Sequence, residues 1–571
     1  MKQEILDVLK DVTKGLGIEG NSIKLDYPEN FNHGDFTTNI ALLSARDLEM
    51  SPKVLAEKIV AEFNKKQPKF IREVNIAGVG FINFFIKDEF FAQEIALISD
   101  TDFGKSVIEK GKKVMIEYTD PNTFKAFHIG HLMSNAIGES ISRLIEYSGA
   151  SVTRICYPSD IGLHIAKAIW AIQKHQDEVP ADGASIIEKT TFLGKMYVEG
   201  TVAYEADPAN KDDIDALNKV IYEKSSPAVN NLYEKGRQWS LEHFELLYKI
   251  LGTKFDDTIF ESDMAPVGLD MVKTHLKNGI FEESEGAIVF KGEKYGLHTR
   301  VFINSKGLPT YEAKDIGLNI TKFNKHPDSE QSIIITASEQ NDYFKVITKI
   351  LSLIDEKNGA KTKHIGHGMM RFASGKMSSR TGKVITAEDL LADIRELVAG
   401  KIVGRGFSAE ETEEISSVIA VGAIKYSILR SSIGGDIIFD SAASISFEGD
   451  SGPYLQYSVV RANTVLNKAK QEGIKDFSNK DSKVPEKVSS VERLISRFPD
   501  IVERAKDEYV PQLVANYLIN LAGTFNSFYA SQTIVNKGDP LSPYYVMLTK
   551  TFRDTMTKGL WLLGIKVPSK M

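Results

Sequence analysis

The chain has 571 residues, of which 42% are hydrophobic and 26% are charged, and its formal net charge is −7. This composition is typical of a soluble globular protein, and the length is enough for about three or four domains. No apolar run reaches the roughly 18 residues of a membrane span, and acidic residues near the start do not fit a signal peptide, so we expect a cytoplasmic protein without membrane contact. The single cysteine, Cys156, excludes a disulfide framework and a multi-cysteine zinc site.

Residues 1–95 are predicted to form a small, separate α+β domain. Apolar residues at helical spacing between Ile5 and Leu16 predict one helix, and residues 52–63 predict another. Residues 71–86, with glycines at 78 and 80, predict a pair of strands. The pattern indicates a folded unit and no particular chemistry.

A strand–helix–strand unit follows at residues 114–157. Val114–Ile116 predict a buried strand, apolar residues at helical spacing predict a helix from His131 that stops before Gly149, and residues 152–157 predict a second strand. The motif His128-Ile129-Gly130-His131 would then lie at a helix N-terminus, where backbone N–H groups and the helix dipole favour a phosphate. Two imidazoles there could donate hydrogen bonds to ATP phosphates, and Gly130 would let the nucleotide approach closely.

The same four letters recur at residues 364–367, with glycines at 366 and 368. No periodic apolar run begins there, so we interpret this copy as the end of a strand. It leads into residues 374–383, a polar, cationic segment flanked by glycines. Lys376 in that segment could stabilise departing pyrophosphate, although a solvated basic loop would have the same composition.

The two motifs together resemble the signatures of class I aminoacyl-tRNA synthetases. Three further segments, residues 116–122, 308–316 and 447–457, are similar specifically to arginyl-tRNA synthetases, as is the final stretch 562–571. The resemblance implies an α/β fold, with a Rossmann-like parallel-sheet catalytic domain at 105–445. It also implies that residues 1–95 contact tRNA and that residues 450–571 form an all-helical anticodon-binding domain.

An arginine site needs carboxylates, because a planar guanidinium offers forked donors that a carboxylate can accept in parallel. Asp315 follows Tyr311 by four residues, so on a helix both would project from one face, although a surface pair would show the same spacing. The resemblance assigns arginine contacts to Tyr311, Asp315 and Gln340. It also implies that Asn122 holds the backbone groups of the substrate.

Three acids complete the predicted arginine site. Asp120 stands where the family has serine, Glu117 is a candidate partner for the ammonium group or a simple strand-end charge, and Glu261 is a candidate second guanidinium carboxylate. His131 is also expected to contact arginine. Met133 stands where many members of the family have arginine.

The charge is unevenly distributed. Residues 451–571 contain 17 Lys and Arg against 11 Asp and Glu, which leaves 53 against 66 for residues 1–450. A basic C-terminal part on an acidic body suits a surface that faces nucleic acid, and ordinary surface variation is the alternative.

The sequence therefore predicts ligation of L-arginine to tRNA(Arg) through an arginyl adenylate, with release of AMP and pyrophosphate. His128, His131 and Lys376 are the expected catalytic residues, and His128, Gly130, His131, Lys376, Ser378 and Ser379 the expected ATP-binding residues. We expect Mg²⁺ to accompany ATP, and we expect no zinc, no protein-bound metal site and a monomer. The alternatives are another class I synthetase, a small-molecule nucleotidyltransferase and a non-catalytic tRNA-binding paralogue.

Overall fold

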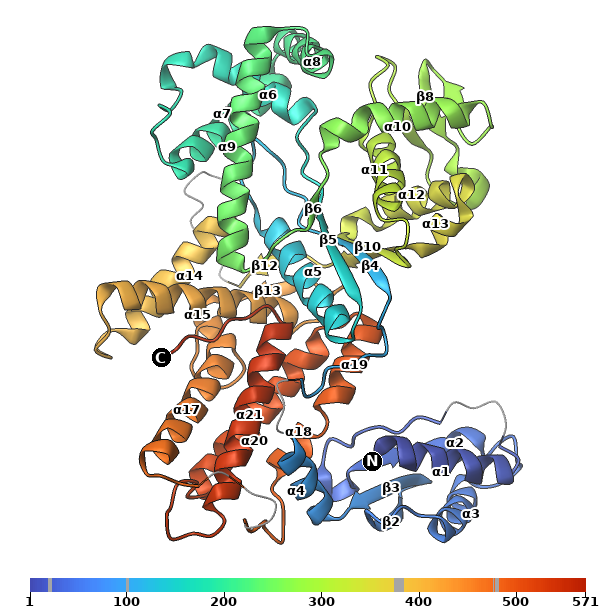
Figure 1. Cartoon of the computed structure of the whole chain (residues 1–571). Coiled ribbons are helices and arrows are strands. Elements are labelled where there is room, and N and C mark those ends of the chain that lie inside the picture. The colour runs from blue at the N-terminus through green and yellow to red at the C-terminus, as the bar shows by residue number, and fades with distance from the viewer. Residues whose placement is uncertain (19–22, 99–101, 374–384, 476, 478–481) are drawn as a thin grey trace. The chain divides into compact units, whose positions relative to one another are not determined.

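The computed structural model describes residues 1–18, 23–98, 102–373, 385–475, 477 and 482–571 (Figure 1). The chain divides into two compact units. The first unit comprises Met1–Phe103, Arg461–Asp500 and Asn520–Met556, and the second comprises Gly104–Val460, Ile501–Ile519 and Thr557–Met571. Among the helices of these described ranges, none is long and apolar enough to cross a membrane.

The first unit contains a three-stranded antiparallel sheet in the order β1-β3-β2. Its elements are α1 (Lys2–Gly15), η1 (Phe31–His33), β1 (Phe36–Thr38), α2 (Ile40–Ser44), α3 (Pro52–Lys65), β2 (Ile71–Ala77), β3 (Phe81–Ile86), α4 (Asp88–Leu97) and α18 (Ser490–Ile495). Apolar side chains of α1, α3 and β3, including Leu9, Phe63 and Phe84, are fully buried in one core. The predicted helices and strands of the N-terminal region are confirmed.

Four helices of the C-terminal region are divided between the two units: α17 (Gly452–Gln471), α19 (Phe498–Glu508), α20 (Gln512–Ser531) and α21 (Ser542–Leu562). No strand is found among the described residues after position 452. The all-helical character predicted for this region is confirmed.

The second unit is built on a parallel sheet of five strands in the order β11-β10-β4-β5-β6. The strands are β4 (Lys113–Glu117), β5 (Ser151–Cys156), β6 (Asp257–Thr258), β10 (Gln331–Ala337) and β11 (Thr362–His367). Taken along the chain, this is the 3-2-1-4-5 order of a Rossmann-like fold, with the direction of winding reversed between β4 and β10. The predicted α/β class is confirmed, and ligands of such sheets bind at that reversal, beyond the carboxyl ends of the strands.

Helices and two small sheets surround the parallel sheet. They are α5 (Ile129–Tyr147), α6 (Leu163–Lys174), η2 (Gln176–Glu178), α7 (Ile186–Ala206), α8 (Pro208–Glu223), α9 (Pro227–Leu251), α10 (Glu261–Leu276), β7 (Glu282–Ser284), β8 (Ala287–Phe290), η3 (Gly292–Tyr295), β9 (Arg300–Ile303), α11 (Tyr311–Lys325), η4 (Ser338–Gln340), α12 (Asn341–Ile354), α13 (Glu356–Lys361), β12 (Met370–Phe372), α14 (Ala387–Ile402), α15 (Ala409–Leu429), β13 (Ile437–Phe439) and α16 (Ser441–Ser444). Helix α5 contacts β4, β5 and β10, and Figure 1 shows it lying along these strands.

Candidate active site

A cavity of about 470 Å³ opens where the sheet reverses its winding. Residues from the ends of β4, β5 and β10, from α10, β9 and α11, and from η4 and α12 line it: Glu117, Asp120, Asn122, Tyr157, Ser159, Glu261, Arg300, Tyr311, Glu312, Asp315, Thr336, Glu339, Gln340, Tyr343 and Phe344. The size is that of a site for a small organic ligand. Except for His131, every residue predicted for arginine binding lines this cavity.

Asp315 presents a carboxylate to the cavity from the second turn of α11. Its Oδ2 accepts a hydrogen bond from the hydroxyl of Tyr343 at 2.5 Å. Burial is the largest influence on this carboxyl and, with the nearby charges of Glu117 and Glu261, raises its pKa to about 8. In the ligand-free protein this carboxyl is therefore mostly protonated near neutral pH.

Two lysines on the inner side of α11 neutralise two of the cavity's acids. Lys322 is fully buried and donates to Glu117 at 2.5 Å. Lys314 donates to Glu261 at 2.7 Å, and Glu261 also accepts the hydroxyl of Ser159. Both predicted arginine-binding glutamates thus have an internal cation as partner.

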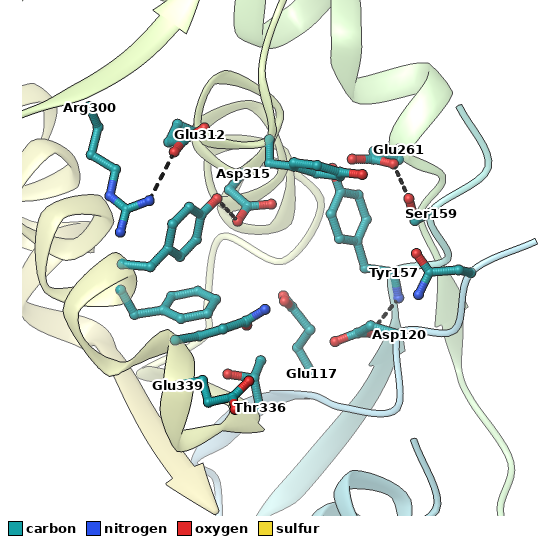
Figure 2. A pocket seen from close by; sticks show the side chains of 15 residues that line it. Glu117, Asp120, Tyr157, Ser159, Glu261, Arg300, Glu312, Asp315, Thr336 and Glu339 are labelled. Carbon is teal, nitrogen blue, oxygen red and sulfur yellow. Dashed lines mark hydrogen bonds and ion pairs between the residues drawn. The ribbon is translucent and has the colours of Figure 1, made fainter. Parts of the chain in front are cut away.

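Asp120 lies in a tight loop after β4. Its Oδ1 accepts the backbone N–H of Tyr157 at 2.8 Å, and burial, followed by the charge of Glu117, raises its pKa well above the usual range. Thr119 and Asp120 have φ angles of 82° and 42°, in a region that residues with a side chain rarely adopt. Figure 2 shows Glu117, Asp120 and Asp315 pointing into the same space.

His128 and His131 occupy the start of α5, as the sequence predicts. Their rings stack with centroids 3.6 Å apart. The Nδ1 of His128 accepts the N–H of Gly130 at 3.1 Å, and the Nδ1 of His131 accepts the N–H of His128 at 3.3 Å. The N–H groups of His128 and Gly130, which the sequence predicted to be free for a phosphate, therefore donate to the two rings instead.

The tautomers of the two rings follow from these bonds. Because each Nδ1 is an acceptor, the proton of a neutral ring must sit on Nε2. Burial lowers the pKa of both imidazoles, most strongly for His131, so the neutral form is favoured. The Nε2 of His131 lies 3.4 Å from the amide nitrogen of Asn122, which places this ring beside the cavity wall.

Lys376, Ser378 and Ser379 lie outside the described residues. The described segments on both sides of them are tied to the core. On one side β12 pairs with β13 in parallel, and on the other Thr386 forms a bridge with His128 while Ala387 donates to the carbonyl of Phe127 at 2.8 Å.

The second copy of the four-residue motif ends β11, as predicted. His364 hydrogen-bonds with Thr336 at 2.8 Å and stacks on Phe344 with ring centroids 4.3 Å apart. Both partners line the cavity, so this histidine supports the wall from behind.

Sequence reasoning did not identify Tyr343 or the two buried lysines. Lys314 and Lys322 share a helical face with Tyr311 and Asp315, and lysines on the same face as a proposed site residue were a usable signal. Arg300, which pairs with Glu312 at 3.3 Å, carried no comparable signal because β9 belongs to a separate small sheet.

Comparisons with known proteins show the family of the chain. A model of the catalytic domain of class I tRNA synthetases (R) matches residues 93–441, a DALR anticodon binding domain matches 455–571, and an arginyl-tRNA synthetase N-terminal domain matches 1–86. The chain is 30% identical to an arginine–tRNA ligase of Clostridium beijerinckii and 31% identical to one of Clostridium botulinum, in each case over the whole of both chains.

Solved structures show the same fold. The arginyl-tRNA synthetase of Thermus thermophilus has a TM-score of 0.82 at 21% identity over the whole of both chains, and that of Plasmodium falciparum has 0.80 at 19% over all of this chain and 99% of the other. The chain therefore belongs to the arginyl-tRNA synthetase family of class I synthetases.

Proposed function

We propose that the protein joins L-arginine to tRNA(Arg) in two steps. The carboxylate of arginine attacks the α-phosphate of ATP, which forms arginyl adenylate and releases pyrophosphate. A terminal ribose hydroxyl of the tRNA then attacks the acyl carbon and releases AMP. The observation that carries this proposal is the charge balance of the cavity.

The cavity contains two acids whose partners are neutral. Lys322 and Lys314 balance Glu117 and Glu261, whereas Asp120 accepts a backbone N–H and Asp315 accepts a hydroxyl. A ligand that brings two cationic groups into this cavity would neutralise both Asp120 and Asp315. Arginine does so, because it carries a guanidinium group at one end and an α-ammonium group at the other.

We assign the two ends of the ligand accordingly. Asp315 and Tyr311 would hold the guanidinium, with Gln340 and Glu261 beside it. A guanidinium can donate two parallel N–H bonds to one carboxylate, and the ammonium group of lysine cannot. Asp120 and Asn122 would hold the α-ammonium and carboxylate groups, with Glu117 and His131 next to them.

ATP would lie against the start of α5. The neutral rings of His128 and His131 would donate from Nε2 to phosphate oxygens, Gly130 would allow close approach, and Lys376, Ser378 and Ser379 would contact the leaving pyrophosphate. Mg²⁺ is commonly held through substrate phosphates rather than by an all-protein cage. Because Glu117 and Glu261 are already paired with lysines, we propose that Mg²⁺ enters bound to ATP, and no zinc is proposed.

The C-terminal helices would read the anticodon of tRNA(Arg), and residues 1–95 would contact the body of the tRNA. The match to an anticodon binding domain at 455–571 and the excess of basic residues there support this assignment. The boundaries 1–95, 105–445 and 450–571 are our proposal for the domains. A monomeric state and a cytoplasmic location also stay predictions.

A charging assay with purified tRNA and a panel of labelled amino acids tests the proposal. We expect arginine alone to be esterified, and we expect His131→Ala to slow adenylate formation by at least about 100-fold with the fold intact, because donors aimed at developing charge act mainly in the transition state. Efficient charging with another amino acid would indicate a different class I synthetase. Binding of tRNA without charging would indicate a non-catalytic paralogue.

A further inference from the structure

Two helix ends of the second unit meet beside the middle of α5. Helix α9 ends at Leu251 and is followed by Gly252, with φ of 70°, and α21 ends at Leu562 and is followed by Gly564, with φ of 67°. The last carbonyl groups of a helix have no partner within the helix, so other donors must satisfy them.

Lys425 of α15 joins these two ends. Its side chain is fully buried, and Nζ donates to the carbonyl of Leu251 at 2.7 Å and to that of Gly564 at 2.9 Å. A cation near helix C-termini is stabilised by the partial negative charge there. Burial lowers the pKa of Lys425 to about 7, so the two carbonyl groups help to keep the side chain protonated.

Helix α5 holds the same two ends from its own side. Arg143 donates to the carbonyl of Trp561 at 2.8 Å and to that of Gly252 at 3.1 Å, and the hydroxyl of Ser140 donates to Leu562 at 2.8 Å. The main chain of Trp561 and Leu562 is thus attached directly to the helix that begins with His128 and His131.

Glu139, one turn before Arg143 in α5, connects Arg143 with Tyr118, the residue that follows β4. Glu139 accepts Nε of Arg143 at 2.6 Å with one oxygen and the hydroxyl of Tyr118 at 2.7 Å with the other. Gly138 makes room for the Tyr118 ring, since a Cβ at this position would lie 2.2 Å from the ring's Cγ. Tyr118 is fully buried and directly precedes the loop that carries Asp120.

The preceding turn of α5 holds that loop itself. Thr253 donates to the Asn135 side chain at 2.9 Å, and Asn135 donates to the Thr119 hydroxyl at 3.1 Å. The N–H of Thr119 donates to Ser134 at 3.0 Å. A β-branched residue at a φ of 82° persists only where its surroundings hold it in place, and these bonds do so.

We propose that these bonds form one buried network that positions the Thr119–Asn122 loop from the main chain of residues 561–564. We call it the α5 network, and it consists of Tyr118, Thr119, Ser134, Asn135, Glu139, Ser140, Arg143, Thr253 and Lys425. Arg143 and Lys425 do not line the cavity, so they are positioning residues. The network gives Leu562 and Gly564, in a segment whose sequence resembles the family, a role at the amino-acid end of the site.

The test compares three variants in arginine-dependent exchange of pyrophosphate into ATP, with tRNA present. Arg143→Lys keeps the charge but cannot bridge two carbonyls and Glu139, and Ser140→Ala removes a single hydrogen bond. Lys570→Gln is the matched control, because Lys570 lies in the same segment but forms a half-exposed ion pair with Glu411.

We expect Arg143→Lys to raise the KM for arginine about tenfold and to lower kcat, while the KM for ATP changes by less than about twofold, because small misplacements of binding groups have large kinetic effects. Ser140→Ala should change the KM for arginine and kcat in the same directions, but less. If Arg143→Lys fails to fold, the result for Ser140→Ala tests the proposal. Lys570→Gln should match the wild type.

Two results would overturn the proposal. One is an unchanged KM for arginine and an unchanged kcat in the folded variants, even with a lower melting temperature, because the network would then serve stability alone. The other is an equal rise in the KM values for arginine and ATP, which would indicate a general loosening of the site.

Discussion

Asp120 and Asp315 differ from Glu117 and Glu261 in what they contact. Each accepts a bond from a neutral donor, whereas Glu117 and Glu261 each face a buried lysine. Burial of a carboxylate without a cation favours its protonated form. The free site is therefore prepared to exchange protons for the cationic groups of a ligand.

If Asp315 receives the guanidinium as proposed, this exchange makes arginine binding depend on pH. Asp315 has a pKa of about 8 in the free protein, chiefly because of burial, and a bound guanidinium would lower that pKa. The contribution of Asp315 to binding is therefore fully present above pH 8 and is lost as the pH falls below that value. We expect the Kd for arginine, measured by calorimetry, to fall at least about tenfold between pH 6 and pH 8.

Asp315→Asn provides the control for that titration. The amide cannot ionise, so the variant should bind arginine weakly and without this pH dependence. A wild-type Kd that stays constant from pH 6 to pH 8 would contradict the role given to Asp315.

At the scale of elements, α11 organises the amino-acid end of the cavity. It presents Tyr311, Lys314, Asp315 and Lys322 on one side, the last of them against Glu117 of β4. The helical spacing of Tyr311 and Asp315 could be predicted from the sequence. The inward direction of the lysines could not, because lysines usually face solvent and their partners come from β4 and α10, far away in the sequence.

Two lysines of α11 give a matched comparison. Lys322→Met should lower the free energy of unfolding by about 3–5 kcal/mol, because it leaves Glu117 as an uncompensated buried charge. Lys325→Met, one turn further on, removes a cation that is 47% exposed and should cost less than about 1 kcal/mol. Chemical denaturation measures both, and equal losses would contradict the importance of the buried pair.

At the scale of the whole molecule, local patterns predicted the strands and helices but not where they meet. Residues 114–157 predicted a strand–helix–strand unit, and β4, α5 and β5 form it. The pairing of β4 with β10, more than 200 residues later, creates the reversal where the cavity lies, and no local periodicity encodes that pairing. The family resemblance, rather than spacing, selected Asn122 and Gln340.

The bonds that α5 and Lys425 of α15 make to the segment 561–564 were also beyond sequence reasoning. They use main-chain carbonyls, which every residue has, so side-chain identity gives no hint of them. The proposed domain boundaries remain predictions, and the two compact units divide the C-terminal helices between them.

Calorimetric titration with arginine and two analogues tests the central claim, that two separate carboxylates receive the two cations of the substrate. Citrulline lacks the guanidinium charge, and 5-guanidinopentanoate, which has the same chain length as arginine, lacks the α-ammonium group. We expect arginine to bind and each analogue to bind at least about 100-fold more weakly, because each leaves one acid of the pair without a cation. Binding of either analogue within a few-fold of arginine would contradict it.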